Sequence, residues 1–202
     1  MTTQDNAQHP ALRSQRLKQI THELHSRLDA LINTYAPFET RANFTRFVVA
    51  QHLFQSELVS LYNDAELTAI GADLPARCRA KAARADLADL ETDVPAAVSG
   101  AVQNPSKAAA MGWLYVSEGS KLGAAFLIKR AVGLGLSATF GARHLGEPDG
   151  GRAVGWKSFV KALDGLQLSA REEAELDKGA IDAFNRFTLL LQQAYATTAE
   201  PA

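Results

Sequence analysis

The sequence has a single cysteine, Cys78, and no dense tract of lysine and arginine among its 202 residues. One cysteine excludes a disulfide framework and a zinc site made of thiolates. The net charge of −1 creates no field that would attract nucleic acid. No apolar run approaches the ~20 residues of a membrane span, and the polar N-terminal residues lack the apolar segment of a signal peptide. We therefore expect a cytoplasmic protein that binds neither nucleic acid nor a membrane.

Prolines are sparse and divide the chain into blocks of helical length, at positions 10, 37, 75, 95, 105, 148 and 201. No block shows the alternating apolar and polar pattern of a strand. A chain of this length with 47% hydrophobic residues can bury one sizeable core. The sequence thus predicts an all-α fold, with a disordered N-terminus over residues 1–10 and a single domain over residues 11–197.

Apolar residues recur at helical spacing through most of that domain. The last helix should begin with a capping box formed by Ser169 and Glu172, and Gly71 should close a short helix. Irregular loops are expected where prolines or glycines gather, at 92–105 and 133–151. The predicted helices cover residues 11–34, 41–62, 64–71, 75–91, 106–132, 152–164 and 169–196.

The most informative stretch is 112–130, GWLYVSEGSKLGAAFLIKR, which has helical length but contains Gly112, Gly119 and Gly123. Each glycine costs about 1 kcal/mol relative to alanine inside a helix. Tyr115, Gly119 and Gly123 follow one another at intervals of four residues and so share a face. Such a face allows either tight packing of two helices or the close approach of a planar cofactor to the backbone. These residues alone leave both interpretations open.

Histidine is the next candidate for chemistry, and the chain has five. No His-Glu-x-x-His or Glu-x-x-His motif is present, which argues against a carboxylate-bridged di-iron centre. A haem needs one axial imidazole, an apolar slot and cations for its propionates. His25 can supply the imidazole, Asp29 one turn later can accept its other ring N–H, and Lys18 and Tyr115 can reach propionates. Without further context, ordinary surface and half-buried roles explain these side chains better than haem binding does.

Two long blocks carry a resemblance to a known family. Residues 16–32, RLKQITHELHSRLDALI, and residues 112–127, GWLYVSEGSKLGAAFL, are followed by GARHL, PDGR and a spaced Trp and Phe. In order and spacing they resemble the bacterial haem oxygenases, closest to the biliverdin-producing enzymes of Gram-negative bacteria. The similarity covers most of residues 12–195. It implies a single-domain helical bundle that holds haem between a proximal helix and a kinked, glycine-rich distal helix.

The resemblance also implies roles for individual residues. His25, rather than His22, matches the axial ligand of the haem iron, and Lys18 and Tyr115 match positions that hold the propionates. The distal helix maps onto Gly119, Ser120 and Gly123. Three further positions match residues that line the distal side or the edge of the haem: Gln51, Phe184 and Phe187.

One position departs from part of the family. Mammalian-type members have an aspartate just after the first distal glycine, where it anchors a water network. This chain has Ser120 there, as the Gram-negative subgroup does. We therefore expect backbone groups, or polar residues such as Gln51 and Ser117, to hold the water.

The implied reaction uses haem as both substrate and cofactor, together with O2 and external electrons. Its products are biliverdin, CO and ferrous iron, and the pair Lys18 and Tyr115 implies selective formation of the IXα isomer. The electron donor would be a ferredoxin or a flavoprotein reductase, with ascorbate as a substitute in vitro, and we expect a monomer. Basic residues could dock that donor or could simply be solvated: Arg77, Arg79, Lys81, Arg84, Lys121, Lys129 and Arg130.

Other functions compete with this one. A carrier or sensor of the same fold would bind haem without degrading it, and turnover separates it from an enzyme. A di-iron oxidase or a thiaminase-like protein could share the helical architecture, although Cys78 lies outside the matching blocks. In a plain interaction bundle, the glycines would serve only to pack helices.

Overall fold

The structure is a computed structural model that describes residues 12–70, 73–96, 102 and 104–196. The described residues form helices and loops, with isolated β-bridges around Ser137 as the only strand-like pairing among them. This confirms the expected all-α fold. The segment 1–10, expected to be disordered, and Gly71, expected to close a helix, lie outside the described residues.

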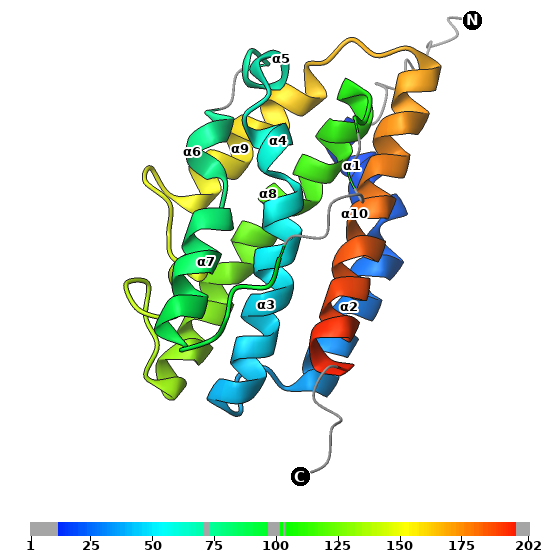
Figure 1. The fold of residues 1–202 in the computed structure, drawn as a ribbon. Coiled ribbons are helices and arrows are strands. Elements are labelled where there is room, and N and C mark those ends of the chain that lie inside the picture. Colours follow the sequence, from blue (N-terminus) through cyan, green and yellow to red (C-terminus); the bar gives the residue numbers. More distant parts are fainter. Residues whose placement is uncertain (1–11, 71–72, 97–101, 103, 197–202) are drawn as a thin grey trace, which may run out of the picture.

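The helices pack side by side in a bundle (Figure 1). Their bounds are α1 (Arg13–Ile20), α2 (His22–Tyr35), α3 (Arg41–Glu57), α4 (Val59–Tyr62), α5 (Ala65–Thr68), α6 (Leu74–Arg77), α7 (Ala80–Asp89), α8 (Lys107–Ala131), α9 (Arg152–Asp164) and α10 (Ala170–Ala196), with the 3-10 turns η1 (Val132–Leu134) and η2 (Arg143–Leu145).

The single helix expected over 11–34 is divided at Thr21, between α1 and α2. The buried Thr21 side chain donates its hydroxyl to the Leu17 carbonyl at 2.7 Å, and its backbone has φ −96° and ψ −1°. A threonine that bonds the carbonyl four residues earlier bends a helix. The bend comes just before His25, so it sets the direction in which α2 carries that residue.

Two other predicted helices are also divided. The helix expected over 41–62 is interrupted at Leu58, and the one expected over 75–91 is interrupted at Cys78, where ψ is 130° and the backbone is extended. Neither interruption involves a glycine or a proline, so no local pattern predicted it. The helix expected over 64–71 is shorter in the structure, where it forms α5 (Ala65–Thr68).

The long helices in the second half of the chain agree with the prediction within one residue at each end. The capping box of α10 is confirmed, because Ser169 N donates to Glu172 Oε2 at 2.7 Å and Glu172 N donates to Ser169 Oγ at 3.4 Å. Ser106 caps α8 by accepting a hydrogen bond from Ala109 N at 3.2 Å.

The centre of the bundle is the contact between α8 and α10, which is backbone against backbone. A Cβ added at Gly112 would lie 2.2 Å from the Leu176 carbonyl oxygen, and one added at Gly179 would lie 2.2 Å from the Ala109 carbonyl oxygen. Each glycine therefore lets the other helix approach. The packing interpretation of the glycines is correct for Gly112.

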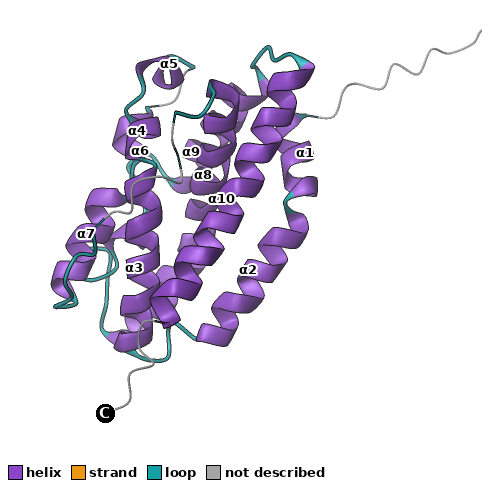
Figure 2. Cartoon of the chain, turned by 45° about the vertical axis from the view of Figure 1, so that its right-hand side comes forward, coloured by secondary structure: helices purple, strands orange, loops and turns teal. Residues whose placement is uncertain are grey.

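The remaining long helices surround this pair. In Figure 2, α2 and α3 lie on either side of α10, and α9 lies behind it near α8. Fully buried Phe44, Phe47, Leu114 and Phe159 fill the core between the helices. None of the helices in the described residues is long and apolar enough to cross a membrane.

Candidate functional site

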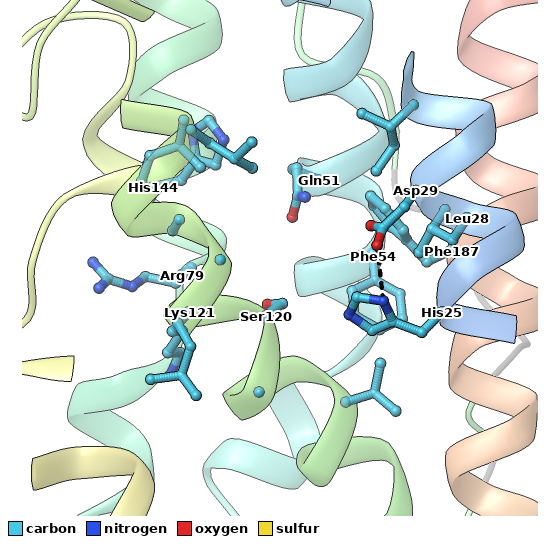
Figure 3. Close-up of a pocket in the computed structure, with 18 of the residues that line it drawn as sticks. His25, Leu28, Asp29, Gln51, Phe54, Arg79, Ser120, Lys121, His144 and Phe187 are labelled. Carbon is cyan, nitrogen blue, oxygen red and sulfur yellow. Dashed lines mark ion pairs between the residues drawn. The ribbon is translucent and has the colours of Figure 1, made fainter. Parts of the chain in front are cut away.

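A cavity of about 660 Å³ opens between α2 on one side and α8 on the other, with α3 and α10 contributing to its walls (Figure 3). Its lining includes every site residue expected from the sequence: Lys18, His25, Gln51, Tyr115, Gly119, Ser120, Gly123, Phe184 and Phe187. These residues come from five different helices. The fold thus brings together positions that lie up to 169 residues apart in the chain, from Lys18 to Phe187.

His25 lies on α2 and faces across the cavity towards α8 (Figure 3). Its Nδ1 lies 3.0 Å from Asp29 Oδ2, one turn further along the helix, and 63% of its side chain is exposed. An ionised carboxylate only accepts hydrogen bonds, so Nδ1 carries the proton and Nε2 keeps a free lone pair. The ring edge packs against the Phe184 ring at 5.8 Å between centroids. The imidazole is therefore oriented from two sides.

The opposite wall is α8, whose glycines have different surroundings. A Cβ at Gly119 would lie 3.5 Å from the Trp156 ring, in ordinary contact, whereas a Cβ at Gly123 would meet nothing within 4 Å. Ser120 turns its hydroxyl back onto its own helix and donates to the Ser117 carbonyl at 2.7 Å. The ribbon of α8 bends near Ser120 in Figure 3. The α8 wall of the cavity therefore carries almost no side chains at these positions.

Two polar residues that line the cavity were expected to bind propionates. Lys18 on α1 is exposed. Tyr115 is 9% exposed, packs its ring against Trp156 at 5.4 Å between centroids, and donates its hydroxyl to the Ser14 carbonyl over a long 3.4 Å. Burial raises the pKa of the Tyr115 phenol, and the negative charge of Asp164 raises it further. The phenol therefore remains a hydrogen-bond donor at neutral pH.

A buried ionic network joins α8 to α4 and α6, and one of its members, Lys121, also lines the cavity. The fully buried Glu118 accepts hydrogen bonds from Arg77 Nε and Tyr62 Oη, each at 2.8 Å, and forms an ion pair with Lys121. Lys121 Nζ also donates to the Arg77 carbonyl at 2.7 Å. Burial lowers the pKa of Lys121 to about 8, and the Glu118 carboxylate opposes that shift.

This network corrects two expectations. Arg77 and Lys121 belong to the buried cluster, and Arg79 donates to the Gly146 carbonyl at 2.9 Å, so these three do not form an exposed basic face. Ser117 is fully buried and hydrogen-bonds to Tyr62 Oη at 2.7 Å and Gln55 Nε2 at 3.0 Å. It therefore braces α8 from behind and does not hold water in the cavity. The sequence alone did not show whether Ser117 faces the cavity or the neighbouring helices.

Several lining residues carry no expectation from the sequence. His144 is the most notable of them, because it reaches the cavity from η2 and is held by the buried Asp86. It lies within the GARHL block that contributed to the resemblance, but no single pattern pointed to the ring. Arg79, Lys121 and Trp156 also reach the cavity.

The helical fold of the described residues and a cavity in which the oriented His25 imidazole faces the glycines of α8 have the features that a helical haem-binding protein needs. The family model described as "Heme oxygenase" matches residues 12–193. The chain belongs to the haem oxygenase family.

Individual relatives agree with the family assignment. The chain is 54% identical over 186 residues to the "Heme oxygenase PigA" of Pseudomonas aeruginosa, an alignment that covers 92% of this chain and 94% of that protein. It is also similar to the crystal structure of the haem oxygenase from Neisseria meningitidis bound to NO and CO. There the TM-score is 0.86 at 34% identity, with 95% of this chain and 96% of that chain covered.

The activity follows from the family. Haem oxygenases bind haem as substrate and prosthetic group, take up O2 and electrons, and degrade haem to biliverdin. The chain is accordingly an oxidoreductase of haem degradation. This decides against the non-degrading carrier, the di-iron or thiaminase-like protein, and the plain interaction bundle.

Proposed function

We propose that His25 is the axial ligand of the haem iron and that the reaction opens the ring at the α-meso carbon, giving biliverdin IXα. The observation that carries the proposal is the oriented His25 ring, with Nδ1 on Asp29 at 3.0 Å and Nε2 free opposite the glycines of α8. A carboxylate on the second nitrogen fixes the tautomer and raises the basicity of the ligating nitrogen.

The cavity suits a porphyrin in three respects. Its walls are mostly apolar, with Phe184 and Phe187 on α10 and Leu28 and Ile32 on α2. The wall at Gly123 has space where a side chain would intrude. A single imidazole is sufficient as a protein ligand, because the porphyrin supplies four nitrogens of its own.

When bound, haem supplies both the iron that activates dioxygen and the ring carbon that is oxidised. The chain itself has to leave room, orient the ring and control water. With no side chains at Gly119 and Gly123, the α8 wall would leave room for dioxygen. Gln51 presents an amide to the same space (Figure 3) and can hydrogen-bond to water there. The aromatic side chains of α10 exclude bulk water from the other wall.

The orientation of the ring selects the carbon that is attacked. The exposed ammonium of Lys18 is placed to bind one propionate, and Tyr115 is placed to donate a hydrogen bond to the other. The phenol would exchange its long 3.4 Å contact with the Ser14 carbonyl for a shorter, charge-assisted bond. These two contacts would hold the haem by its propionates and so set its orientation, and we infer attack at the α-meso carbon from them.

The external electron donor, a ferredoxin or a flavoprotein reductase, should dock close to the cavity. Lys129 and Arg130 are exposed at the end of α8, and Arg130 lines the cavity and stacks over the Phe38 ring at 4.6 Å. An acidic donor surface would complement these charges. Reduction by such a donor should slow as ionic strength rises. We propose that the enzyme works as a cytoplasmic monomer.

The decisive experiment is an optical titration of the protein with hemin, followed by ascorbate or a reductase in air. The expected result is a 1:1 Soret band that decays into the broad red absorbance of biliverdin, and chromatography should identify the IXα isomer. A band that persists with reductant would refute degradation. A product that is mainly the β or δ isomer would refute the proposed orientation of the ring.

A further inference from the structure

The start of α1 and the end of α9 cap each other. Asp164, the last residue of α9, accepts hydrogen bonds from Ser14 N through Oδ1 and from Ser14 Oγ through Oδ2, both at 2.8 Å. In return, Arg13 Nη1 donates to the carbonyls of Leu163 at 2.6 Å and Asp164 at 3.2 Å. Its Nη2 donates to the Leu166 carbonyl at 3.1 Å. A free N–H group at one helix end and free carbonyls at the other are therefore paired across the contact.

The position of α1 depends on these polar bonds. The helix has eight residues, of which Leu17 is buried, and its own N-cap residue, Leu12, supplies no capping side chain. A helix of this length is not stable by itself, and one buried leucine leaves it free to shift or turn. Asp164 supplies the missing cap from another helix. Arg13 adds an ion pair with Glu173 in the first turn of α10.

The charge of Asp164 suits α1 and not α9. Negative partial charge gathers at the C-terminal end of a helix, so a carboxylate is unfavourable in the last residue of α9. The same carboxylate is favourable at the N-terminal end of α1, where N–H groups are free. Asp164 does not line the cavity. Its contacts therefore serve the placement of α1.

This contact adjoins the two residues proposed to bind the propionates. Lys18 lies one turn after Ser14 on α1, and Tyr115 Oη on α8 donates to the Ser14 carbonyl at 3.4 Å. Burial raises the pKa of Tyr115 and the charge of Asp164 raises it further, so the carboxylate lies close to the phenol. Ser14 is thus joined to Lys18 through the helix, to Tyr115 through its carbonyl, and to Asp164 through its N–H and hydroxyl.

We propose that Asp164 is a positioning residue for haem orientation, because it fixes α1 against α9 and so sets the spacing between the Lys18 ammonium and the Tyr115 hydroxyl. Two anchoring groups on separate helices select one orientation of a ligand only while their spacing stays constant. The inference rests on the proposed function, in which these two groups hold the propionates. Asp164 acts through Ser14 and has no direct part in binding.

The first test uses the protein without haem. Backbone amides of α1 should exchange hydrogen about fivefold faster in Asp164→Ala than in the wild type, as for the loss of one helix cap. Asp64→Ala is the matched control, because Asp64 caps α5 by accepting from the N–H groups of Glu66 and Leu67 at 2.9 Å and does not line the cavity. In the control, α1 should exchange at the wild-type rate. Wild-type exchange in Asp164→Ala would overturn the proposal, whatever reaction the protein catalyses.

The second test measures the biliverdin isomers formed by the haem-loaded enzyme. Asp164→Ala should keep the Soret band, because His25 is unchanged, but the ratio of the IXα isomer to the others should fall about fivefold, the factor expected for the lost cap. Asp164→Asn can still accept from Ser14 N and should restore most of the selectivity. Asp64→Ala should leave the ratio unchanged. A loss of stability alone would lower the yield of every isomer and would not change their ratio.

Ser14→Ala removes the hydroxyl bond but keeps the backbone bond to Asp164, so it should shift the ratio less than Asp164→Ala does. It decides the question if Asp164→Ala does not fold. A wild-type isomer ratio in every one of these variants that folds would overturn the proposal, as would equal shifts in Asp164→Asn and Asp164→Ala. Failure of the wild-type protein to degrade haem, or a wild-type product that is not mainly IXα, would instead refute the proposed function.

Discussion

Asp29 Oδ2 lies 3.0 Å from His25 Nδ1, one turn further along α2, and both side chains are more than half exposed. The pair is not part of the core, since α2 has no fully buried residue. An exposed contact of this kind contributes little to stability. On the proposed axial role of His25, the pair serves to fix which ring nitrogen is free to bind the iron.

Replacing His25 by alanine should therefore abolish the ordinary Soret band while the helical circular dichroism stays unchanged. Asp29→Ala should keep the band but weaken hemin binding about tenfold, the lower end of the effect of such supporting carboxylates. His22→Ala is the matched control, because His22 is an exposed histidine on the same helix that does not line the cavity. A Soret band in His25→Ala equal to that of the wild type would exclude His25 as the ligand.

The sequence predicted the site better than it predicted the helix boundaries. The residues that the family resemblance named all line the cavity. The divisions at Thr21, Leu58 and Cys78 were missed, since they arise from side-chain bonding and tertiary packing and not from glycine or proline. The buried Glu118 was missed for the same reason, because periodicity does not reveal which charged residues find partners across the bundle.

The glycines of α8 show most clearly what the sequence alone could not decide. From the sequence alone, the glycines could serve either helix packing or cofactor binding. The structure shows that their surroundings differ from one position to the next. Gly112 packs against the backbone of α10, and Gly123 borders the open cavity. Only the arrangement of neighbouring helices distinguishes the two.

We therefore expect a glycine-to-alanine substitution to affect the free energy of unfolding differently at these two positions. Gly112→Ala should lower the free energy of unfolding by about 1–3 kcal/mol or more, because the new Cβ would meet the Leu176 carbonyl at 2.2 Å. Gly123→Ala should leave it unchanged or raise it by up to about 1 kcal/mol through helix propensity. Urea denaturation measures both. Equal destabilisation by the two variants would contradict the assignment of the glycines.

The Glu118 network predicts that removing one buried charge, with little change in side-chain shape, strongly destabilises the fold. Glu118→Gln leaves Arg77 and Lys121 buried without their counter-charge, which should cost about 3–5 kcal/mol. Glu23→Gln is the control, because Glu23 forms an exposed pair with Arg27 that should contribute less than about 1 kcal/mol. Chemical denaturation at neutral pH compares them. A cost for Glu118→Gln no larger than that of the control would show that the buried network does not support α8.

Lys121 should make stability depend on alkaline pH. Its folded pKa is about 8 because burial disfavours the charged form, whereas in the unfolded chain it returns to about 10.4. Between these values the unfolded state binds more protons, so the free energy of unfolding should rise with pH. Relative to Lys121→Met, the wild type should gain about 1–2 kcal/mol from pH 8 to 9.5. A parallel pH profile in the two proteins would contradict the lowered pKa.

If Lys18 and Tyr115 hold the propionates as proposed, the regiochemistry depends on these two contacts. Lys18→Ala removes the ammonium and Tyr115→Phe removes the hydroxyl, and each variant keeps His25 and the glycine wall. We expect hemin to bind with at most about tenfold lower affinity, as for one lost charge-assisted hydrogen bond. The product should shift from biliverdin IXα to a mixture of isomers, because the haem can then rotate in its plane. Chromatography of the products measures the shift. If both variants, and the double variant, still yield only the IXα isomer, other residues set the rotation of the ring.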